Sequence, residues 1–306
     1  MKPAPFTHHA PTTVDEALAL LAQLDNAKVL AGGQSLVPVL NMRLATPDHL
    51  VDINRLADLA RIEVDADRVR VGAIVRHAAL ERDEAAHRAL PLLRQGLGWV
   101  AHPAIRNRGT TVGSIAHADP SGEMPSILAI TGGSVRVAST RGERVISADH
   151  FFVGPMESVL EHDELVLDVD FPLFPAGTVT GFDELARRSG DYALSGVAVA
   201  ITPAADGTIA AARASFVSVT ERPDVLDLTP QLAGLRPDQV GTDVLATVAE
   251  AARTHVDPVD DIHASADYRR HLSGTICRRV TSSLLAELAN PSAPTAVPSA
   301  EKKVAS

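Results

Sequence analysis

Apolar residues near the start of the chain recur first with helical and then with strand-like spacing. Residues 13–24 are expected to form a helix, because one face collects the apolar side chains Val14, Ala17, Leu18, Leu21 and Leu24. Thr13 and Glu16 have the spacing of a capping box at its start. Residues 28–31 and 49–53 are short apolar runs that favour strands.

The first of these strands ends at Gly32 and Gly33, and an apolar, helix-like segment restarts after Gln34 and Ser35. Glycine lets another group approach the backbone closely, and N–H groups at a helix start have no partner within the helix. The turn therefore suits a phosphate, with a plain turn as the alternative. Its spacing is not GxGxxG, which indicates an architecture other than the dinucleotide-binding Rossmann turn.

The middle of the chain alternates between hairpin and helix patterns. Two hairpins are expected, from residues 61–64 with 69–73 and from residues 134–139 with 144–147. Helices are expected at 78–100, broken at Pro91, and at 123–130, with a further strand at 165–171. Residues 102–122 show no clear periodicity and are expected to form a long functional loop.

Pro172 and Pro175 mark a boundary, beyond which the pattern changes. Three successive strands are expected at residues 178–188, 197–202 and 208–219, followed by helices at 237–255 and 264–289. From residue 290 the chain is rich in Pro, Ser and Ala, which is typical of a disordered tail.

Composition excludes several classes of protein. The 306 residues are 45% hydrophobic and 22% charged, as in globular proteins of about two domains. A net charge of -10 disfavours a broad nucleic-acid-binding surface. One cysteine, Cys277, allows neither a disulfide within the chain nor a cysteine-ligated iron–sulfur cluster. With no signal-peptide core and no apolar run long enough to span a membrane, the cytoplasm is the expected compartment.

A second segment rich in Gly and Thr, residues 109–114, could form another wall of donors around a phosphorylated ligand, with Asp119 accepting hydrogen bonds from a polyol; an ordinary surface loop is the alternative.

His117, Asp119 and Glu123 do not have the spacing of a known metal site, and Ser35 and Ser114 do not lie in a nucleophile elbow. His8 and His9 are expected in a solvated loop, and Cys277 in the core. The turn at residues 187–192 would present the ring of Tyr192 to a flat ligand or pack it on the surface.

Four segments, in this order and spacing, resemble the FAD-binding medium subunit of the molybdenum hydroxylases, which include aerobic carbon monoxide dehydrogenase and relatives of xanthine dehydrogenase. They are residues 31–54, 102–128, 186–194 and 264–279, and the likeness covers about residues 1–288. Many family members have two glycines in the second segment before its Asn or Ser, whereas a single Gly113 precedes Ser114 here.

The resemblance implies an α+β fold. Residues 1–175 would form a two-subdomain α/β FAD-binding domain of the vanillyl-alcohol oxidase (PCMH) type, divided at about residue 55. Residues 176–288 would form a C-terminal domain of a three-stranded antiparallel sheet with helices, as in the carbon monoxide dehydrogenase flavoprotein. Residues 289–306 would be the disordered tail.

The resemblance also implies how FAD is held. Residues 32–36 would wrap the pyrophosphate, residues 110–114 would form the second FAD loop, Asp119 would meet ribityl or phosphate-side groups, and Tyr192 with Asp191 would lie close to the isoalloxazine. The full set of expected FAD-binding residues is Ala31, Gly32, Gly33, Gln34, Ser35, Leu36, Thr110, Thr111, Val112, Gly113, Ser114, Ala118, Asp119, Glu123, Asp191 and Tyr192. No catalytic side chain and no metal ligand is expected.

The implied role is electron transfer. Substrate would be oxidised on a molybdopterin-containing large subunit, and electrons would pass through the [2Fe–2S] clusters of a small subunit to this FAD and then to an external acceptor. The expected assembly is a dimer of heterotrimers. The alternatives are a self-sufficient flavin oxidase or reductase of the same fold, and a scaffold that kept the fold but lost FAD.

Overall fold

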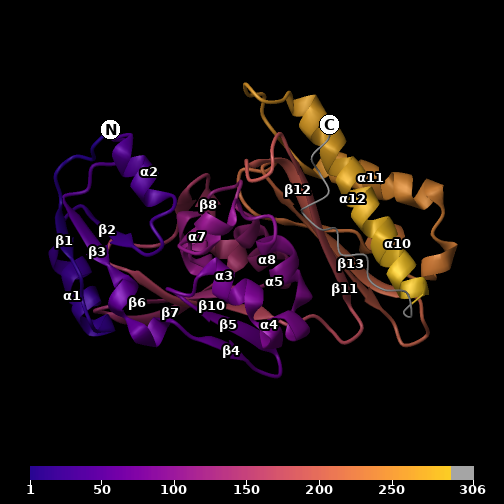
Figure 1. Cartoon of the computed structure of the whole chain (residues 1–306). Helices are drawn as coiled ribbons and strands as arrows, with labels where there is room; N and C mark the ends of the chain where they lie inside the picture. Colours follow the sequence, from indigo (N-terminus) through magenta and orange to yellow (C-terminus); the bar gives the residue numbers. More distant parts are fainter. Residues whose placement is uncertain (291–306) are drawn as a thin grey trace. The chain divides into compact units, whose positions relative to one another are not determined.

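A computed structural model describes residues 1–290 of the chain (Figure 1). The residues form two compact units. Unit 1 comprises Met1–Ala89, Pro103–Ala118 and Gly132–Pro172, and unit 2 comprises Leu90–His102, Asp119–Thr131 and, among the described residues, 173–290. Two short segments from the N-terminal half thus belong to unit 2. The tail predicted for residues 289–306 lies, beyond residue 290, outside the described residues.

Unit 1 begins with a three-stranded parallel sheet in the order β1-β3-β2. Its elements are β1 (Thr7–His9), α1 (Val14–Gln23), β2 (Ala27–Leu30), α2 (Leu36–Asn41) and β3 (His49–Asp52). Half of the predicted capping box of α1 is confirmed, because Thr13 Oγ1 accepts from the Glu16 N–H at 3.2 Å. The Glu16 carboxylate accepts instead from the N–H of Thr12, one residue before the cap, at 2.7 Å. The solvated loop predicted for His8 and His9 is wrong, since both lie in β1, where backbone pairing with β3 holds them.

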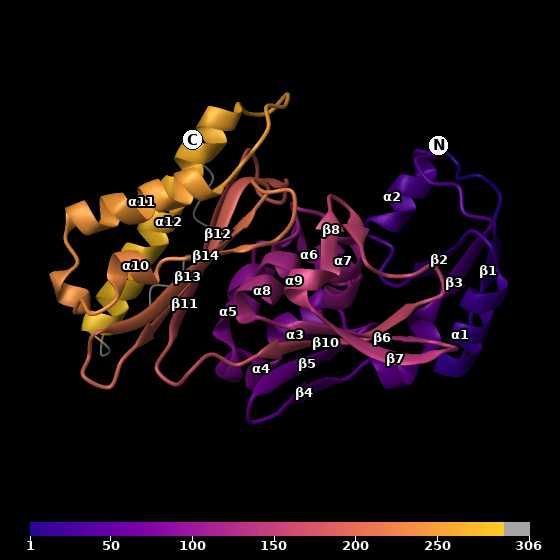
Figure 2. The ribbon, with the colours of Figure 1, turned by 180° about the vertical axis from the view of Figure 1, so that it is seen from behind.

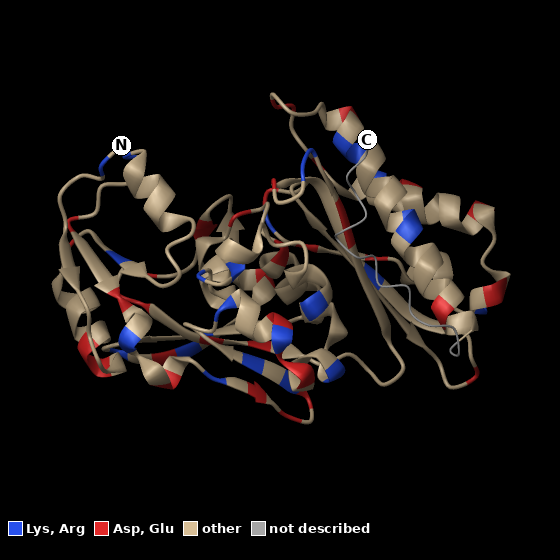
Figure 3. Ribbon diagram, in the orientation of Figure 1, with Lys and Arg blue, Asp and Glu red and all other residues tan. Residues whose placement is uncertain are grey.

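A five-stranded antiparallel sheet completes the framework of unit 1, in the order β4-β5-β10-β6-β7. Its strands are β4 (Ile62–Val64), β5 (Arg68–Gly72), β6 (Ser134–Ser139), β7 (Gly142–Ser147) and β10 (Leu165–Pro172), so both predicted hairpins are confirmed. Basic and acidic residues share its strands, as Figure 3 shows. Arg70 donates to Asp170 at 2.8 Å and Arg136 pairs with Asp168. Complementary charges thus cover the polar face of this sheet.

The remaining elements of unit 1 are short. They are the 3-10 helices η1 (Ile53–Arg55) and η2 (Ala57–Leu59), the helices α3 (His77–Arg82), α4 (Glu84–Ala89), α6 (Pro103–Arg106), α7 (Thr111–His117) and α9 (Ala148–Phe151), and the strands β8 (Phe152–Gly154) and β9 (Glu157–Ser158).

Two expectations about this region need correction. The predicted break at Pro91 is confirmed, since α5 (Pro91–Leu97) begins there, but the helix before it is further divided into α3 and α4, because the chain becomes extended at Asp83, whose carboxylate accepts from the Ala86 N–H at 2.8 Å. The long loop expected at residues 102–122 contains α6 and α7. Helix α7 has only seven residues, too few for a helical period to stand out in the sequence.

Unit 2 is built on one antiparallel sheet, in the order β11-β12-β13-β14. The three predicted strands are β11 (Val179–Ala186), β12 (Ala193–Pro203) and β13 (Ile209–Val217), and a fourth, β14 (Val225–Asp227), extends the expected three-stranded sheet at its edge. Strand β14 was missed because three residues carry no readable alternation.

Helices cover both faces of this sheet (Figure 2). One face carries α10 (Thr229–Leu232), α11 (Thr242–His255) and α12 (Ala266–Ala289), with η3 (Pro237–Gln239), and the other carries α5 and α8 (Glu123–Thr131). Strand β12 is consequently buried along both faces, with Val197 and Val199 in the core formed with α12. Cys277 lies in that core, as predicted, and burial raises the pKa of its thiol to about 12.

Candidate functional site

The first glycine turn connects β2 to α2. Gly33 has a φ of +72°, a left-handed conformation that favours glycine. Gln34 Nε2 donates to the carbonyl oxygen of Gly32 at 3.2 Å, and the Ser35 hydroxyl makes no capping bond to α2. Within residues 1–290, the consecutive N–H groups from Gly33 to Leu36 donate to no backbone or side-chain acceptor of the chain. Consecutive free N–H groups around a left-handed residue form a concave anion-binding cradle.

The second predicted segment lies directly against this turn. A methyl group added to Gly32 would lie 2.5 Å from the carbonyl oxygen of Arg108 and 2.7 Å from the Cα of Gly109. Both distances are shorter than a van der Waals contact, so only glycine allows the two backbones to approach this closely. The structure therefore brings together the turn and the segment that begins with Thr110, as expected for two walls of one site.

The hydroxyl groups of the second segment are engaged inside the protein. Thr110 caps α7, with its Oγ1 accepting from the Gly113 N–H at 3.1 Å, and Thr111 Oγ1 lies 3.1 Å from Nδ1 of His77. Thr110 and Thr111 are buried, as is Val112, whereas Gly113 and Ser114 are half-buried. Thr110 and Thr111 consequently shape the backbone of this segment, and Ser114 has the more accessible hydroxyl.

His77 is a buried neutral base beneath this segment. The backbone N–H of His77 donates to the carbonyl oxygen of Gly109 at 2.9 Å. Burial, together with the positive charge of Arg106, lowers the pKa of His77 to about 4. Because the imidazole is neutral at physiological pH, it can share a hydrogen bond with the Thr111 hydroxyl without placing a charge in the core.

Two residues of the site were not predicted. Asn54 Nδ2 donates to the carbonyl oxygen of Ala31 at 2.9 Å, and Arg76 donates to Asn54 Oδ1 at 2.6 Å. The position of Asn54 in the sequence could have located it, because Asn54 follows β3 as Gly32 follows β2. The two strands are parallel neighbours, so their carboxyl ends lie at the same sheet edge. Nothing in the sequence marks Arg76.

Ala118 ends α7 in a left-handed conformation, with a φ of 54°. Its side chain is buried, and its carbonyl oxygen accepts from the Met156 N–H at 2.9 Å. Ala118 thus ends the helix of the second segment and presents only backbone groups. Met156, whose N–H it accepts, is also at positive φ.

In unit 2 the structure brings Asp119, Glu123 and Tyr192 together. Asp119 Oδ1 accepts from the Ser121 N–H at 2.8 Å, and the same carboxylate accepts from the Tyr192 hydroxyl. Shielding of that hydroxyl from water, then the negative charges of Asp119 and Glu123, raises the pKa of Tyr192 to about 12. The ring itself is 68% exposed. An aromatic surface is therefore held by its hydroxyl end and open to solvent.

The turn before Tyr192 has its own support. Gly190 has a φ of +85° and packs against the imidazole of His102, which lies where a side chain would stand. The Asp191 N–H donates to the carbonyl oxygen of Arg188 at 3.2 Å, and the Asp191 side chain is exposed. This turn presents Tyr192 at the start of β12, as the sequence predicted.

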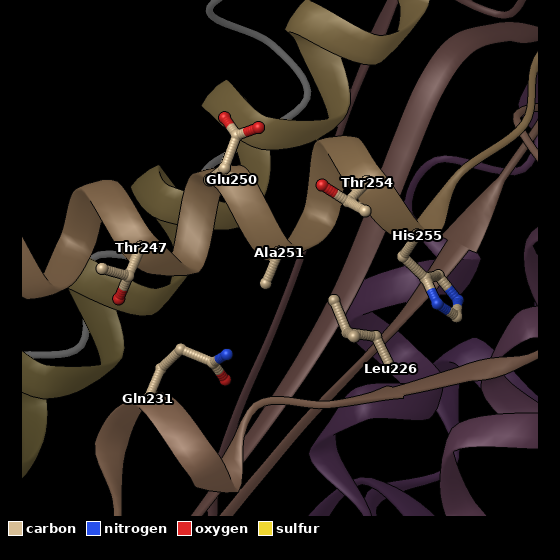
Figure 4. A pocket seen from close by; sticks show the side chains of 7 residues that line it. All are labelled: Leu226, Gln231, Thr247, Glu250, Ala251, Thr254 and His255. Atoms are coloured by element: carbon tan, nitrogen blue, oxygen red, sulfur yellow. The ribbon is translucent and has the colours of Figure 1, made fainter.

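Other candidate chemistry is limited. No group of three or more His, Cys, Asp or Glu in residues 1–290 is arranged to hold a metal ion. None of the helices in that range is long and apolar enough to cross a membrane. Figure 4 shows a groove in unit 2 that contains no residue predicted to bind FAD. Its lining residues are Leu226, Gln231, Thr247, Glu250, Ala251, Thr254 and His255.

Family comparisons agree with this geometry. Residues 4–174 match the FAD binding domain in molybdopterin dehydrogenase, and residues 180–284 match the CO dehydrogenase flavoprotein C-terminal domain. The chain is 38% identical to the nicotine 6-hydroxylase medium subunit of Paenarthrobacter nicotinovorans, over 91% of this chain and 97% of the relative.

Solved structures give the same result. The chain is similar to quinoline 2-oxidoreductase from Pseudomonas putida 86, with a TM-score of 0.88 and 37% identity over 94% of this chain and 99% of the other. It is equally similar in fold to carbon monoxide dehydrogenase from Hydrogenophaga pseudoflava, with a TM-score of 0.88, 33% identity and the same coverage. The chain belongs to the family of FAD-binding medium subunits of molybdenum hydroxylases, which are oxidoreductase flavoproteins.

Proposed function

We propose that this chain holds FAD through the turn at residues 31–36 and the adjoining residues 110–114, and relays electrons for a reaction on another chain. The observation that carries the binding proposal is the cradle of free N–H groups from Gly33 to Leu36. A pyrophosphate is a dianion whose oxygens accept several hydrogen bonds, which fits such a cradle. The absence of a side chain at Gly32 keeps the second segment within reach of the same ligand.

The chain's own residues bind and orient the cofactor. Bound FAD supplies the redox chemistry, since a flavin can take up single electrons and release a pair. Gly32 lets the second segment approach the turn, Gly33 adopts the left-handed conformation of the turn, and Thr110 and His77 keep the second segment in shape. No side-chain acid or base is required in this role.

The electron donors are proposed to be partner subunits. A chain with one cysteine, itself buried in the core of unit 2, cannot ligate an iron–sulfur cluster. The clusters must then belong to a small [2Fe–2S] subunit, with substrate oxidation on a molybdopterin-containing large subunit, in a dimer of heterotrimers. The medium-subunit name of the nicotine 6-hydroxylase relative supports a multi-subunit assembly.

Two experiments test this function. The purified full chain is expected to bind about one FAD per chain. The natural complex is expected to contain a molybdopterin-containing large subunit and a small subunit with reducible [2Fe–2S] clusters. A folded chain that stays colourless after FAD addition would refute the binding proposal. Turnover of an organic substrate by the isolated chain would instead support a self-sufficient oxidase.

A further inference from the structure

We infer that Asn54 and Arg76 are positioning residues that lock the two FAD-binding segments of unit 1 to each other, and we call the pair the Asn54–Arg76 brace. The inference rests on the proposed FAD function of these segments. It concerns residues outside both glycine segments, whose side chains connect the two segments through a continuous series of hydrogen bonds.

The Asn54 end of the brace holds the first turn. Asn54 Nδ2 donates to the carbonyl oxygen of Ala31 at 2.9 Å and to Asp52 Oδ1 at 2.6 Å. The backbone N–H of Asn54 donates to the same Asp52 oxygen at 2.9 Å. Burial by itself would raise the pKa of Asp52, but these hydrogen bonds, together with the contact between His8 and the carboxylate, lower it. The carboxylate therefore stays ionised and fixes the amide. The side-chain oxygen Oδ1 of Asn54 then faces Arg76.

The Arg76 end holds the second segment. One terminal nitrogen of Arg76 donates to Asn54 Oδ1 at 2.6 Å, and the other donates to the carbonyl oxygen of Arg108 at 2.5 Å. Arg76 also pairs with Thr110 through the backbone as an isolated antiparallel bridge. The brace therefore ends on the two carbonyl groups that immediately precede the contacting glycines, Ala31 before Gly32 and Arg108 before Gly109.

The contact between the glycines explains why a brace is needed. Gly32 and Gly109 meet through backbone atoms and have no side chains that could interlock. Individual dispersion contacts are weak, so such a contact alone would let one segment slide along the other. A planar guanidinium with two directed hydrogen bonds removes that freedom before ligand binding, which lowers the entropy cost of binding.

The brace also carries a positive charge, that of the Arg76 guanidinium. Burial and the nearby charge of Arg108 lower the pKa of Arg76, yet an arginine remains protonated at any physiological pH. Both hydrogen-bond partners of its terminal nitrogens, Asn54 Oδ1 and the Arg108 carbonyl, are neutral. The negative charge of Asp52 acts in the opposite direction on the pKa of Arg76 and offsets part of the positive charge of the brace.

The test is FAD titration of the purified full chain, with binding followed by flavin fluorescence. Arg76→Gln and Asn54→Ala are each expected to weaken FAD binding about tenfold, the effect of losing a hydrogen bond to a charged group. Arg76→Lys is expected to recover only part of the loss, because an ammonium group cannot reproduce the planar two-point contact. The double variant is expected to lose no more FAD affinity than the single variant that binds FAD more weakly, since either change breaks the same link.

Arg70→Gln is the matched control, because Arg70 is a partly buried arginine of unit 1 bound to Asp170 rather than to the glycine segments. It is expected to lower thermal stability and leave FAD affinity unchanged. Wild-type affinity in Arg76→Gln, additive losses in the double variant, or an equal loss in Arg70→Gln would each overturn the brace. Failure of the wild-type chain to bind FAD would instead refute the proposed function.

Discussion

Gly32 packs so closely on Gly109 that a methyl group on the first would lie 2.7 Å from the Cα of the second. The two residues lie far apart in the sequence, one after β2 and one before α7. Because backbone meets backbone there, the two segments form one continuous surface of peptide groups. This relationship is the basis of the proposed FAD site.

Gly32→Ala is expected to abolish FAD binding or weaken it by more than a hundredfold. The added methyl group would collide with the Arg108 carbonyl and separate the segments, and overpacking of this kind costs about 1–3 kcal/mol of stability. FAD titration and thermal unfolding measure the two effects. Gly154→Ala is the control, since a methyl group there makes only an ordinary contact, 3.9 Å from Glu157. Equal FAD affinity of both variants would contradict the prediction.

Thr110→Val is expected to lower the free energy of unfolding by about 1 kcal/mol, because α7 loses its capping hydroxyl while the size of the side chain is kept. FAD affinity should fall as well, since the cap shapes the second segment. Thr110→Ser retains the hydroxyl and should stay close to the wild type in both respects. Urea unfolding with and without FAD measures these changes, and a Ser variant as weak as the Val variant would count against the capping role.

Acidification is expected to destabilise unit 1 through His77. Its folded-state pKa of about 4 lies below the ordinary value of 6.5, so between these values the unfolded chain binds the additional proton. The stabilisation is complete above pH 6.5 and decreases as the pH falls toward 4, by up to about 3 kcal/mol at 1.36 kcal/mol per pKa unit. His77→Gln should remove this part of the slope when unfolding free energy is measured against pH. Parallel pH profiles of the variant and the wild type would exclude this role.

Tyr192→Ala is expected to increase the fluorescence of bound flavin and shift its visible absorption, because the resemblance to the family predicts this ring close to the isoalloxazine. Tyr192→Phe keeps the ring but loses the hydrogen bond to Asp119, so an intermediate effect is expected. Tyr268→Ala is the control, because Tyr268 is the other tyrosine of the chain, is 45% exposed on α12 and is not among the residues expected to bind FAD. Identical flavin spectra in Tyr192→Ala and the wild type would refute the placement.

The regular elements of the fold could largely be predicted from local patterns. The stripe of α1, the two hairpins of the five-stranded sheet and the long helix α12 each repeat with a clear period over enough residues. Strand β1, helix α7 and strand β14 were missed because each is very short and is stabilised mainly by its neighbours. The Thr110 and Thr111 hydroxyls were expected to face a ligand, whereas helix formation directs them inward.

The chain's residue order alone indicated the two glycine segments, the family and the lack of enough cysteines in these 306 residues to ligate an iron–sulfur cluster, because these depend on residue identity and spacing. The contact of Gly32 with Gly109, the neutral state of His77 and the Asn54–Arg76 brace were decided only by folding. Each joins residues that are distant in sequence through contacts of a few ångströms. Such contacts depend on the packing of whole strands and helices, which no local spacing encodes.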